Sequence, residues 1–415
     1  ENPDSAYPVP GQLSFTQFPN LGMMTTYDAS SFCPDSASTA SSMAAGEKTL
    51  SGVINYDVTL TRPFKLITEY AKEANKKIGV ISSVSVDHAT PAAYYAKQPS
   101  RNDYYDIGLE LIDSGFEYFA GGGLLKPTGA EGDQADLYAL AEKAGYHVVK
   151  TQAEAEQVTG GPVVIIDEHL ADSDAMAYEI DRTDDMWALA DYVEKGIEVL
   201  SQDKDGFFMM CEGGKIDWMC HANDAATTLR EVIDFDNAVR VAYEFARKHP
   251  DDTLIVVTGD HETGGLTLGF AGTGYRSYIE NLRFQKCSRD RMTDQFRKLE
   301  QPSFEQVKPL ITEMAGLVFA ADGRREKGGL NLTENEEKTL QEAFERQYKD
   351  GKFTGGAVLT DAVIRLLNNK SAVAWTTGAH TALPVSTTAY GAGAELFSNM
   401  IDNTDISKRL KQVVR

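Results

Sequence analysis

The segment from residue 212 to residue 224 concentrates side chains of the types that bind metal ions. Asp217 and His221 are four residues apart, so they share one face of a helix if the residues after Gly214 are helical. Zinc accepts imidazole nitrogen and carboxylate oxygen, and an open catalytic zinc site usually takes three protein ligands. The pair therefore predicts part of a zinc site that His380 could complete. A helix with a solvated aspartate and a buried histidine has the same spacing, so the pair alone leaves both interpretations open.

Several apolar segments run directly into ligand-type side chains, as strands do at the edge of a sheet. These segments are residues 77–86 before Asp87 and His88, 206–210 before Glu212, 253–259 before Asp260 and His261, and 371–378 before His380. In an open parallel sheet, ligands bind beyond the carboxyl ends of the strands. Four of the seven histidines lie in these places: His88, His221, His261 and His380. We therefore expect one metal-binding edge, at which Asp260 and His261 form a second ligand pair.

Two further side chains offer oxygen ligands, and a third offers a nucleophile. Glu212 and Thr90 carry the hard oxygen donors that Mg²⁺ prefers, although a lone threonine here also suits a turn or a helix cap. Ser36 follows a proline turn and opens the small-residue run 36–46. A helix N-terminus favours developing negative charge, and an adjacent zinc ion would lower the pKa of the hydroxyl. Ser36 is thus a candidate nucleophile; the alternative is that Asp35 or Ser36 only caps the helix.

An α/β fold follows from the order of the elements that carry these side chains. Helical periodicity and strand-like segments alternate from residue 61, and a long helix is expected from Asp224 to Lys248. This alternation predicts a three-layer sandwich with a central, mostly parallel sheet flanked by helices. Residues 270–370 break the rhythm because they are charged and helix-rich, with a capping box at residues 333–336. We interpret them as an insertion or cap within a single catalytic domain that spans residues 1–415.

Composition excludes several classes of partner. The chain has 415 residues, of which 40 are Lys or Arg and 62 are Asp or Glu, so its formal net charge is −22. Such a surface repels nucleic-acid phosphate, so no nucleic-acid partner is expected. No run approaches the ~18–20 apolar residues that a membrane span needs. The four cysteines (Cys33, Cys211, Cys220 and Cys287) lack CxxC spacing, and we expect single thiols rather than a disulfide framework.

Five motifs together resemble the alkaline phosphatase family. They are DSA at 35–37, DHATP at 87–91, EGGKIDWMCHAND at 212–224, TGDHETGG at 258–265 and TGAHT at 377–381. They keep the family's order over most of the chain, and five motifs in register are highly specific. The resemblance implies hydrolysis of phosphate monoesters through a phosphoserine intermediate, at a site with two Zn²⁺ and one Mg²⁺. It also implies a periplasmic or extracellular homodimer that binds small phosphomonoesters and inorganic phosphate.

The resemblance assigns each metal ligand by position. One Zn²⁺ would be held by Asp217, His221 and His380, and the second by Asp260 and His261. Mg²⁺ would be held by Thr90 and Glu212, with His88 in contact directly or through water.

The groups that would act on phosphate are assigned in the same way. Ser36 would be the phosphorylated nucleophile. Arg101 would clamp the phosphate, because a planar guanidinium fork suits two phosphoryl oxygens at once. Trp218 stands where some bacterial members have a phosphate-contacting lysine, so it would line the substrate site and alter the affinity for phosphate.

One feature of the family has no counterpart in residues 1–30. The family begins with an apolar strand and an Asp-Gly-x-Gly-type turn whose aspartate bridges the second and third metals. Asp4 and Asp28 have no such strand before them. We expect a chain that lacks the first strand of its domain through truncation. The alternative is a weakly active or inactive metal-binding form.

The motifs also admit other interpretations. A phosphodiesterase or sulfatase-like hydrolase of the same superfamily is a competing activity, although residues 33–36 do not supply the Cys/Ser-x-Pro-x-Arg that sulfatases need. Asp167, Glu168 and His169 also follow a strand-like segment but match no family ligand. Residues 121–123 are three glycines without the Gly-Lys-Ser/Thr ending of a phosphate loop, so we expect a tight turn there.

Overall fold

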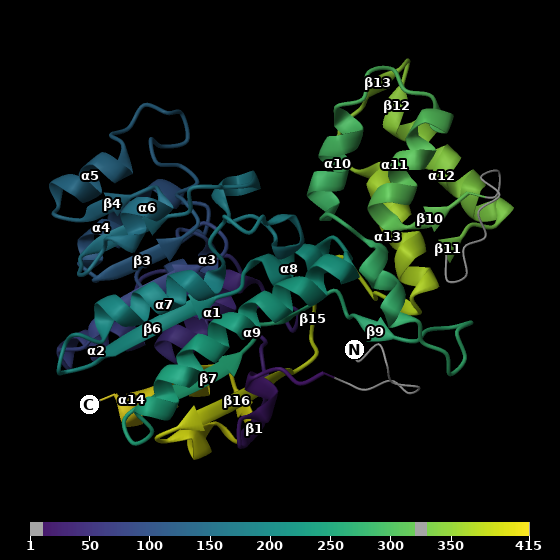
Figure 1. Cartoon of the computed structure of the whole chain (residues 1–415). Helices are drawn as coiled ribbons and strands as arrows, with labels where there is room; N and C mark the ends of the chain where they lie inside the picture. The colour runs from purple at the N-terminus through teal and green to yellow at the C-terminus, as the bar shows by residue number, and fades with distance from the viewer. Residues whose placement is uncertain (1–10, 320–329, 415) are drawn as a thin grey trace.

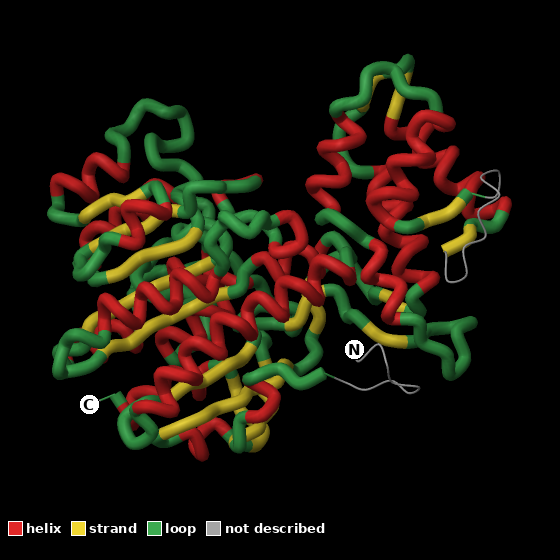
Figure 2. The backbone as a smooth tube through the Cα atoms, viewed as in Figure 1, coloured by secondary structure: helices red, strands yellow, loops and turns green. Residues whose placement is uncertain are grey.

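A five-stranded parallel sheet forms the centre of the protein (Figures 1 and 2). The structure is a computed structural model that describes residues 11–319 and 330–414. The sheet order is β4-β5-β3-β2-β6, and every pair of neighbours is parallel. The strands are β2 (Lys77–Ser82), β3 (Tyr118–Gly121), β4 (His147–Val149), β5 (Val163–Ile166) and β6 (Phe207–Glu212). The predicted alternation of strands and helices is therefore confirmed.

Alternate side chains of these strands build a core on each face of the sheet. Val80 and Phe119 belong to one buried cluster, whereas their chain neighbours Ile81 and Ala120 belong to another. The first face is covered by α1 (Ser36–Ala45), α2 (Ile67–Glu73), α3 (Ala89–Ala92), α4 (Tyr104–Ser114) and α5 (Leu137–Lys143). The second face is covered by α6 (Gln152–Glu156), α7 (Leu189–Leu200) and α9 (Ala225–Lys248). These three layers confirm the predicted α/β sandwich.

A second, four-stranded sheet has the order β17-β1-β16-β7 and is mostly antiparallel. Its strands are β1 (Asn20–Thr25), β7 (Leu254–Thr258), β16 (Val385–Gly391) and β17 (Asn399–Asp402), and α14 (Thr404–Val413) packs beside β17. We expected the strand at 253–259 to end at the same parallel sheet as the others. It instead pairs antiparallel with β16, so this expectation was wrong. β6 and β7 are the terminal strands of their two sheets.

The strand expected at residues 371–378 is also corrected by the structure. Only β14 (Val373–Ala374) is extended there, and it pairs with β9 (Thr267–Leu268) rather than with a large sheet. The backbone N–H groups of Thr376 and Thr377 both donate to the carbonyl of Gly264, at 2.9 and 3.2 Å. These two bonds to one acceptor turn the chain, so the strand cannot continue.

The described part of residues 270–370, here called the insertion segment, folds around a hydrophobic cluster that includes Phe296, Ile311 and Leu340. Ala225, Ala226 and Val373 join this cluster from outside the segment. Its elements are η4 (Ile279–Phe284), α10 (Arg289–Arg297), α11 (Phe304–Ala315), α12 (Glu334–Gln347), α13 (Val358–Lys370) and the short pairs β10-β11 (Leu317–Val318, Leu330–Asn331) and β12-β13 (Tyr348–Lys349, Lys352–Phe353). The predicted capping box at Thr333 begins α12. In Figure 1 this segment stands to one side of the central sheet.

No helix within residues 11–319 and 330–414 has the length and apolar character needed to cross a bilayer. All four cysteines are free thiols.

Candidate metal centre and active site

Helix α8 (Lys215–His221) and a short strand pair bring the first three predicted ligands together. The helix forms directly after Gly214, as expected, and places His221 Nε2 3.4 Å from Asp217 Oδ2. Strand β15 (His380–Thr381) pairs antiparallel with β8 (Glu262–Thr263). This pairing carries His380 Nε2 to 2.9 Å from His221 Nε2 and 3.5 Å from Asp217 Oδ1. One carboxylate and two imidazoles, which are ligand types that suit zinc, therefore converge.

Backbone carbonyls fix the orientation of both imidazoles. His221 Nδ1 lies 2.8 Å from the carbonyl oxygen of Gly378, and His380 Nδ1 lies 2.5 Å from that of Pro34. A carbonyl oxygen only accepts, so each Nδ1 carries the hydrogen and each neutral ring keeps its lone pair on Nε2. Two such lone pairs at 2.9 Å repel unless a proton or a cation lies between them. The donor set therefore fits a divalent metal.

The charges of this cluster are consistent with that fit. Burial raises the pKa of Asp217, but hydrogen bonds with His221 and His380 outweigh burial and hold the pKa well below its usual value. The hydrogen bond with Asp217 raises the pKa of His221. Burial lowers the pKa of His380, yet the contacts with Asp217 and the Pro34 carbonyl raise it overall. The carboxylate thus stays ionised and favours positive charge beside it, whether from a proton or from a metal ion.

A second cluster surrounds the predicted nucleophile at the start of α1. Asp35 caps this helix by accepting from Ser38 N at 3.1 Å, so Ser36 is its first residue. Ser36 Oγ lies 3.0 Å from His261 Nε2, which in turn lies 3.3 Å from Asp260 Oδ2. Asp35 is therefore the residue that caps α1, whereas the Ser36 hydroxyl faces the ligand pair Asp260 and His261. Ser36 is only 6% exposed, so its surroundings exclude most water.

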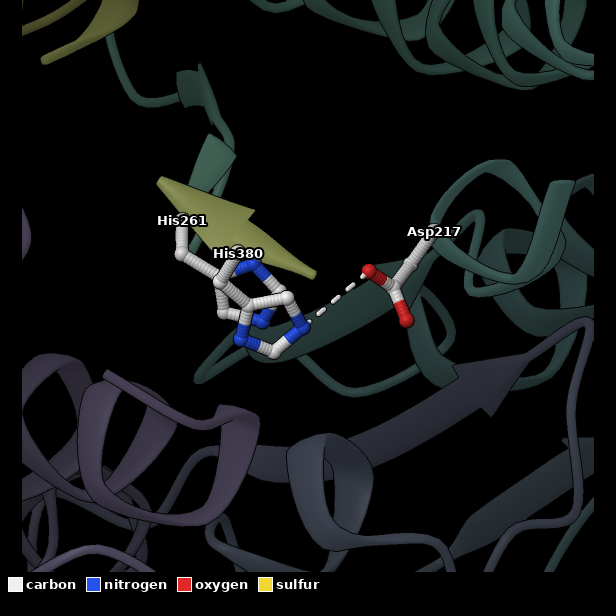
Figure 3. Close-up of side chains that lie close together, drawn as sticks. All are labelled: Asp217, His261 and His380. Atoms are coloured by element: carbon white, nitrogen blue, oxygen red, sulfur yellow. Dashed lines mark ion pairs between the residues drawn. The ribbon is translucent and has the colours of Figure 1, made fainter. Parts of the chain in front are cut away.

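The two clusters touch each other. The rings of His261 and His380 stack with centroids 3.6 Å apart, and Figure 3 shows both rings beside Asp217. The ligand atoms of these three residues lie within 4.8 Å of one another. The hydroxyl of Thr263 donates to Asp217 Oδ1 at 2.5 Å and lies 3.2 Å from His261 Nδ1. One threonine therefore contacts a ligand of each predicted zinc site.

The predicted oxygen ligands form a third, buried group. Glu212 ends β6, and the hydroxyl of Ser82 at the end of β2 donates to its Oε2 at 2.5 Å. Burial raises the pKa of Glu212 to about 8; hydrogen bonds from Ser82 and Thr90 oppose this effect, and the charge of Asp260 adds to it. A buried carboxyl group near other carboxylates is stabilised as an anion by a bound cation. Glu212 and Thr90 thus fit a hard divalent ion.

Arg101, His88 and Trp218 lie together beside these groups. Arg101 Nη1 is 3.0 Å from Asp35 Oδ2, and its Nη2 is 3.4 Å from His88 Nε2. The rings of His88 and Trp218 meet edge to face with centroids 6.0 Å apart. Burial lowers the pKa of His88 to about 4, and Arg101 adds to that effect. His88 is therefore neutral, and its buried Nδ1 has no hydrogen-bond partner in the described part of the chain.

Sequence reasoning missed the residues that orient the ligands. Asp35 was considered only as a cap, yet it also pairs with Arg101. Thr263 lies inside the TGDHETGG motif, but neither its residue type nor its position in the motif marks it as a contact of the metal ligands. The carbonyls of Pro34 and Gly378 cannot be recognised from residue type at all, because every residue carries one.

The competing candidates have structural roles. Asp167 accepts from Tyr192 Oη at 2.9 Å and from His169 N at 2.6 Å, so its carboxylate is occupied inside the fold. The tight turn expected at residues 121–123 is a bend at Gly122 that follows β3. Gly121 has a φ of +115°, and a Cβ there would lie 1.9 Å from the carbonyl oxygen of Ser82, so the glycine permits a close approach of two strands.

The fold and this site define a metal-dependent hydrolase of the α/β class. The family model for alkaline phosphatase matches residues 6–415. Alkaline phosphatase 3 of Bacillus subtilis is 31% identical over 94% of this chain and 79% of its own length, and alkaline phosphatase 4 of the same organism is 30% identical over 98% and 83%. The chain belongs to the alkaline phosphatase family, whose members hydrolyse phosphate monoesters.

Solved structures agree with this assignment. The cold-active alkaline phosphatase from a psychrophilic Shewanella superposes with a TM-score of 0.84 at 28% identity, covering 100% of this chain and 94% of that one. The enzyme from Thermus thermophilus gives a TM-score of 0.78 at 26% identity, covering 96% and 83%. A variant of the TAB5 alkaline phosphatase, with a TM-score of 0.67 and 25% identity over 98% and 91%, carries Mg in a site termed M3.

Proposed function

We propose that this protein hydrolyses phosphate monoesters through a phosphoserine at Ser36. The observation that carries the proposal is the position of the Ser36 hydroxyl. It lies at the N-terminus of α1, 3.0 Å from His261 Nε2, and His261 stacks on His380 of the three-ligand cluster. A helix N-terminus and cationic surroundings both favour the alkoxide form of a serine.

The residues present would hold three metal ions. Asp217, His221 and His380 would bind one Zn²⁺, Asp260 and His261 the second, and Glu212 and Thr90 an Mg²⁺, with His88 nearby. When bound, the ions supply positive charge that favours the attacking and departing oxygens of an in-line displacement.

The side chains around this centre would orient the ester. The guanidinium of Arg101, held by Asp35 at 3.0 Å, would donate to two phosphoryl oxygens. The Ser36 hydroxyl then loses its proton as its oxygen bonds to phosphorus, and the alcohol oxygen leaves with the electron pair of the broken P–O bond. The departing oxygen takes up one proton, so the net transfer of the proton is from Ser36 to the alcohol. Water hydrolyses the phosphoserine in a second displacement, releasing inorganic phosphate and restoring Ser36. The buried position of Ser36 limits competing attack by bulk water during the first step.

Replacing Ser36 by alanine tests this mechanism. Ser36→Ala is expected to lower phosphomonoesterase turnover by about 10³-fold or more and to remove the phosphoenzyme trapped in acid, because no other hydroxyl occupies its place. Zinc and magnesium contents measured by elemental mass spectrometry should stay at the wild-type values. Ser42→Ala on the same helix is the matched control, since among the described residues the Ser42 hydroxyl bonds only to the Ser38 carbonyl, at 2.9 Å. Unchanged turnover in Ser36→Ala would remove Ser36 from the mechanism.

We further propose, on the family relationship, that the protein acts outside the cytoplasm as a homodimer and that the insertion segment belongs to the same catalytic domain. Analytical ultracentrifugation of the metal-loaded protein tests the oligomeric state, and fractionation of the producing cells tests the compartment.

A further inference from the structure

A cavity of about 420 Å³ adjoins the three-ligand cluster. His221 forms part of its wall on one side, and helix α13 of the insertion segment contributes Asp361, Arg365 and Asn369. Trp375 also lines the cavity. It lies just after the insertion segment, where the chain returns to the central layers. The volume lies within the range of about 300–1,000 Å³ that is typical of small-molecule sites.

The cavity lies at the far end of a series of contacts that begins at Ser36. Ser36 Oγ contacts His261, His261 stacks on His380, His380 contacts His221, and His221 borders the cavity. In an in-line displacement the leaving group departs away from the nucleophile. A leaving group that departs on the side of the cluster remote from Ser36 would meet His221, which also borders this cavity.

Arg365, an exposed side chain in the cavity wall, has no ion-pair partner among the described residues. Arg289, which also lines the cavity, is already paired with Asp361 at 2.7 Å and Asp290 at 3.4 Å. Arg365 lies one turn after Asp361 on α13, but its guanidinium makes no ion pair or side-chain hydrogen bond with the described residues. In a chain of net charge −22, a free guanidinium beside the metal centre is suited to an anion.

The rest of the wall is mixed, with apolar surface around Trp375 beside the side chains of Asn223, Asn368 and Asn369. Trp375 packs its six-membered ring over Gly264, where an added Cβ would lie 2.5 Å from Trp375 Cε3, so the indole is held in place. Ile364 and Val373 add aliphatic surface to the same cavity. Asn368 donates to the carbonyl of Asn223 at 2.7 Å and fixes α13 against the end of α8. Among the described residues that line the cavity, Arg365 is thus a guanidinium without an ion-pair partner.

We propose that this cavity binds the leaving group of the substrate, and that Arg365 selects monoesters whose leaving group carries an anionic substituent on a planar apolar body. The proposal rests on the proposed phosphomonoesterase function and adds a substrate class to it. Arg365 acts on specificity only, because its guanidinium meets the leaving group and not the phosphorus.

Two aryl phosphates that differ in charge alone test this selection. 4-Carboxyphenyl phosphate and 4-carbamoylphenyl phosphate have nearly the same shape, and only the first carries an anion on its leaving group. For the metal-loaded enzyme, Arg365→Met is expected to lower the ratio of kcat/KM for the carboxylate ester over the amide ester by about tenfold, since a charge-assisted hydrogen bond is lost. Arg365→Lys should restore part of the ratio. Arg346→Met, an exposed arginine of the same segment outside the cavity, should leave the ratio at its wild-type value.

Binding of the free leaving group gives a readout that does not depend on turnover. Saturation-transfer NMR should show 4-hydroxybenzoate binding to the wild type more tightly than 4-hydroxybenzamide, and Arg365→Met should remove the difference. An unchanged kcat/KM ratio and unchanged binding in Arg365→Met would overturn the proposal while leaving the phosphatase function intact. If the wild type hydrolyses neither ester, the proposed function fails, and the NMR comparison alone decides whether the cavity prefers the anion.

Discussion

At the scale of single residues, the site depends on groups that orient the ligands as much as on the ligands. The Nδ1 hydrogens of His221 and His380 donate to backbone carbonyls, which directs both Nε2 lone pairs to one point. Partners of this kind fix the tautomer and raise the basicity of a ligating imidazole. Thr263 has a comparable effect on a carboxylate, because its hydroxyl donates to Asp217 Oδ1.

Thr263→Val tests that contribution. The substitution keeps the shape of the side chain but removes the hydrogen bond to Asp217, so the ligand carboxylate can rotate. We expect zinc affinity, measured by competition with a chromogenic chelator, to fall about 10–100-fold with the fold retained. Thr267→Val, at an exposed position of β9, is the matched control. Equal affinities for the two variants would contradict a positioning role for Thr263.

At the scale of elements, close contacts between strand ends set the positions of the ligand-bearing turns. Gly121 ends β3 directly opposite Ser82 of β2, the residue that also donates to Glu212. A Cβ at Gly121 would lie 1.9 Å from the Ser82 carbonyl oxygen, and the φ of +115° is unfavourable for any other residue. The glycine therefore fixes the separation of the strand ends beneath the predicted magnesium ligands.

Gly121→Ala is expected to destabilise the protein by about 3 kcal/mol or more, because a backbone clash adds to the conformational strain. The measurement is the free energy of unfolding from urea titration. Gly52→Ala is a matched control that separates the two effects, since Gly52 also has a positive φ (+80°) but nothing lies within 4 Å of its Cβ position. We expect the control to cost about 1 kcal/mol from strain alone. A similar cost for both variants would show that the clash relaxes freely.

At the scale of the whole molecule, buried carboxylates attach the insertion segment to the central layers. Asp224 caps α9 through Thr227 N at 3.1 Å and also accepts from Gln285 Nε2 at 2.8 Å and Arg289 N at 3.0 Å. Asp181 accepts from both Ser288 N and Ser288 Oγ. These contacts hold α10 and, through the Arg289–Asp361 pair, the wall of the cavity beside the metal centre.

Asp224→Ala should therefore loosen the insertion segment. The change removes a helix cap and leaves buried N–H donors without an acceptor, at a combined cost of about 2–4 kcal/mol. We expect limited proteolysis within residues 270–370 to become faster, with cleavage sites identified by mass spectrometry. Asp294→Ala serves as the control, because in the part of the chain that the structure describes Asp294 forms an ion pair only with Arg297, on its own helix. Protection equal to that of the wild type would show that other contacts attach the segment.

The sequence by itself determined what depends on local periodicity and residue type. The four-residue spacing of Asp217 and His221 places both on one face of the helix that forms there. The apolar runs at 77–86 and 206–210 favour strands, which the structure forms as β2 (Lys77–Ser82) and β6 (Phe207–Glu212). The sequence likewise places Ser36 at the first position of a helix, because a capping residue, Asp35, directly precedes it.

Only the tertiary structure decided which distant segments meet. The pairing of β15 with β8 brings His380 to His221, which lies 159 positions earlier in the chain. The contact with Asp35 brings Arg101 to the site, across a separation of 66 positions. The sequence favoured a strand at 371–378, but two hydrogen bonds to Gly264 bend that segment, and no residue pattern reveals them. Long-range contacts depend on how all the layers pack together, so the spacing of residues along the chain cannot determine them.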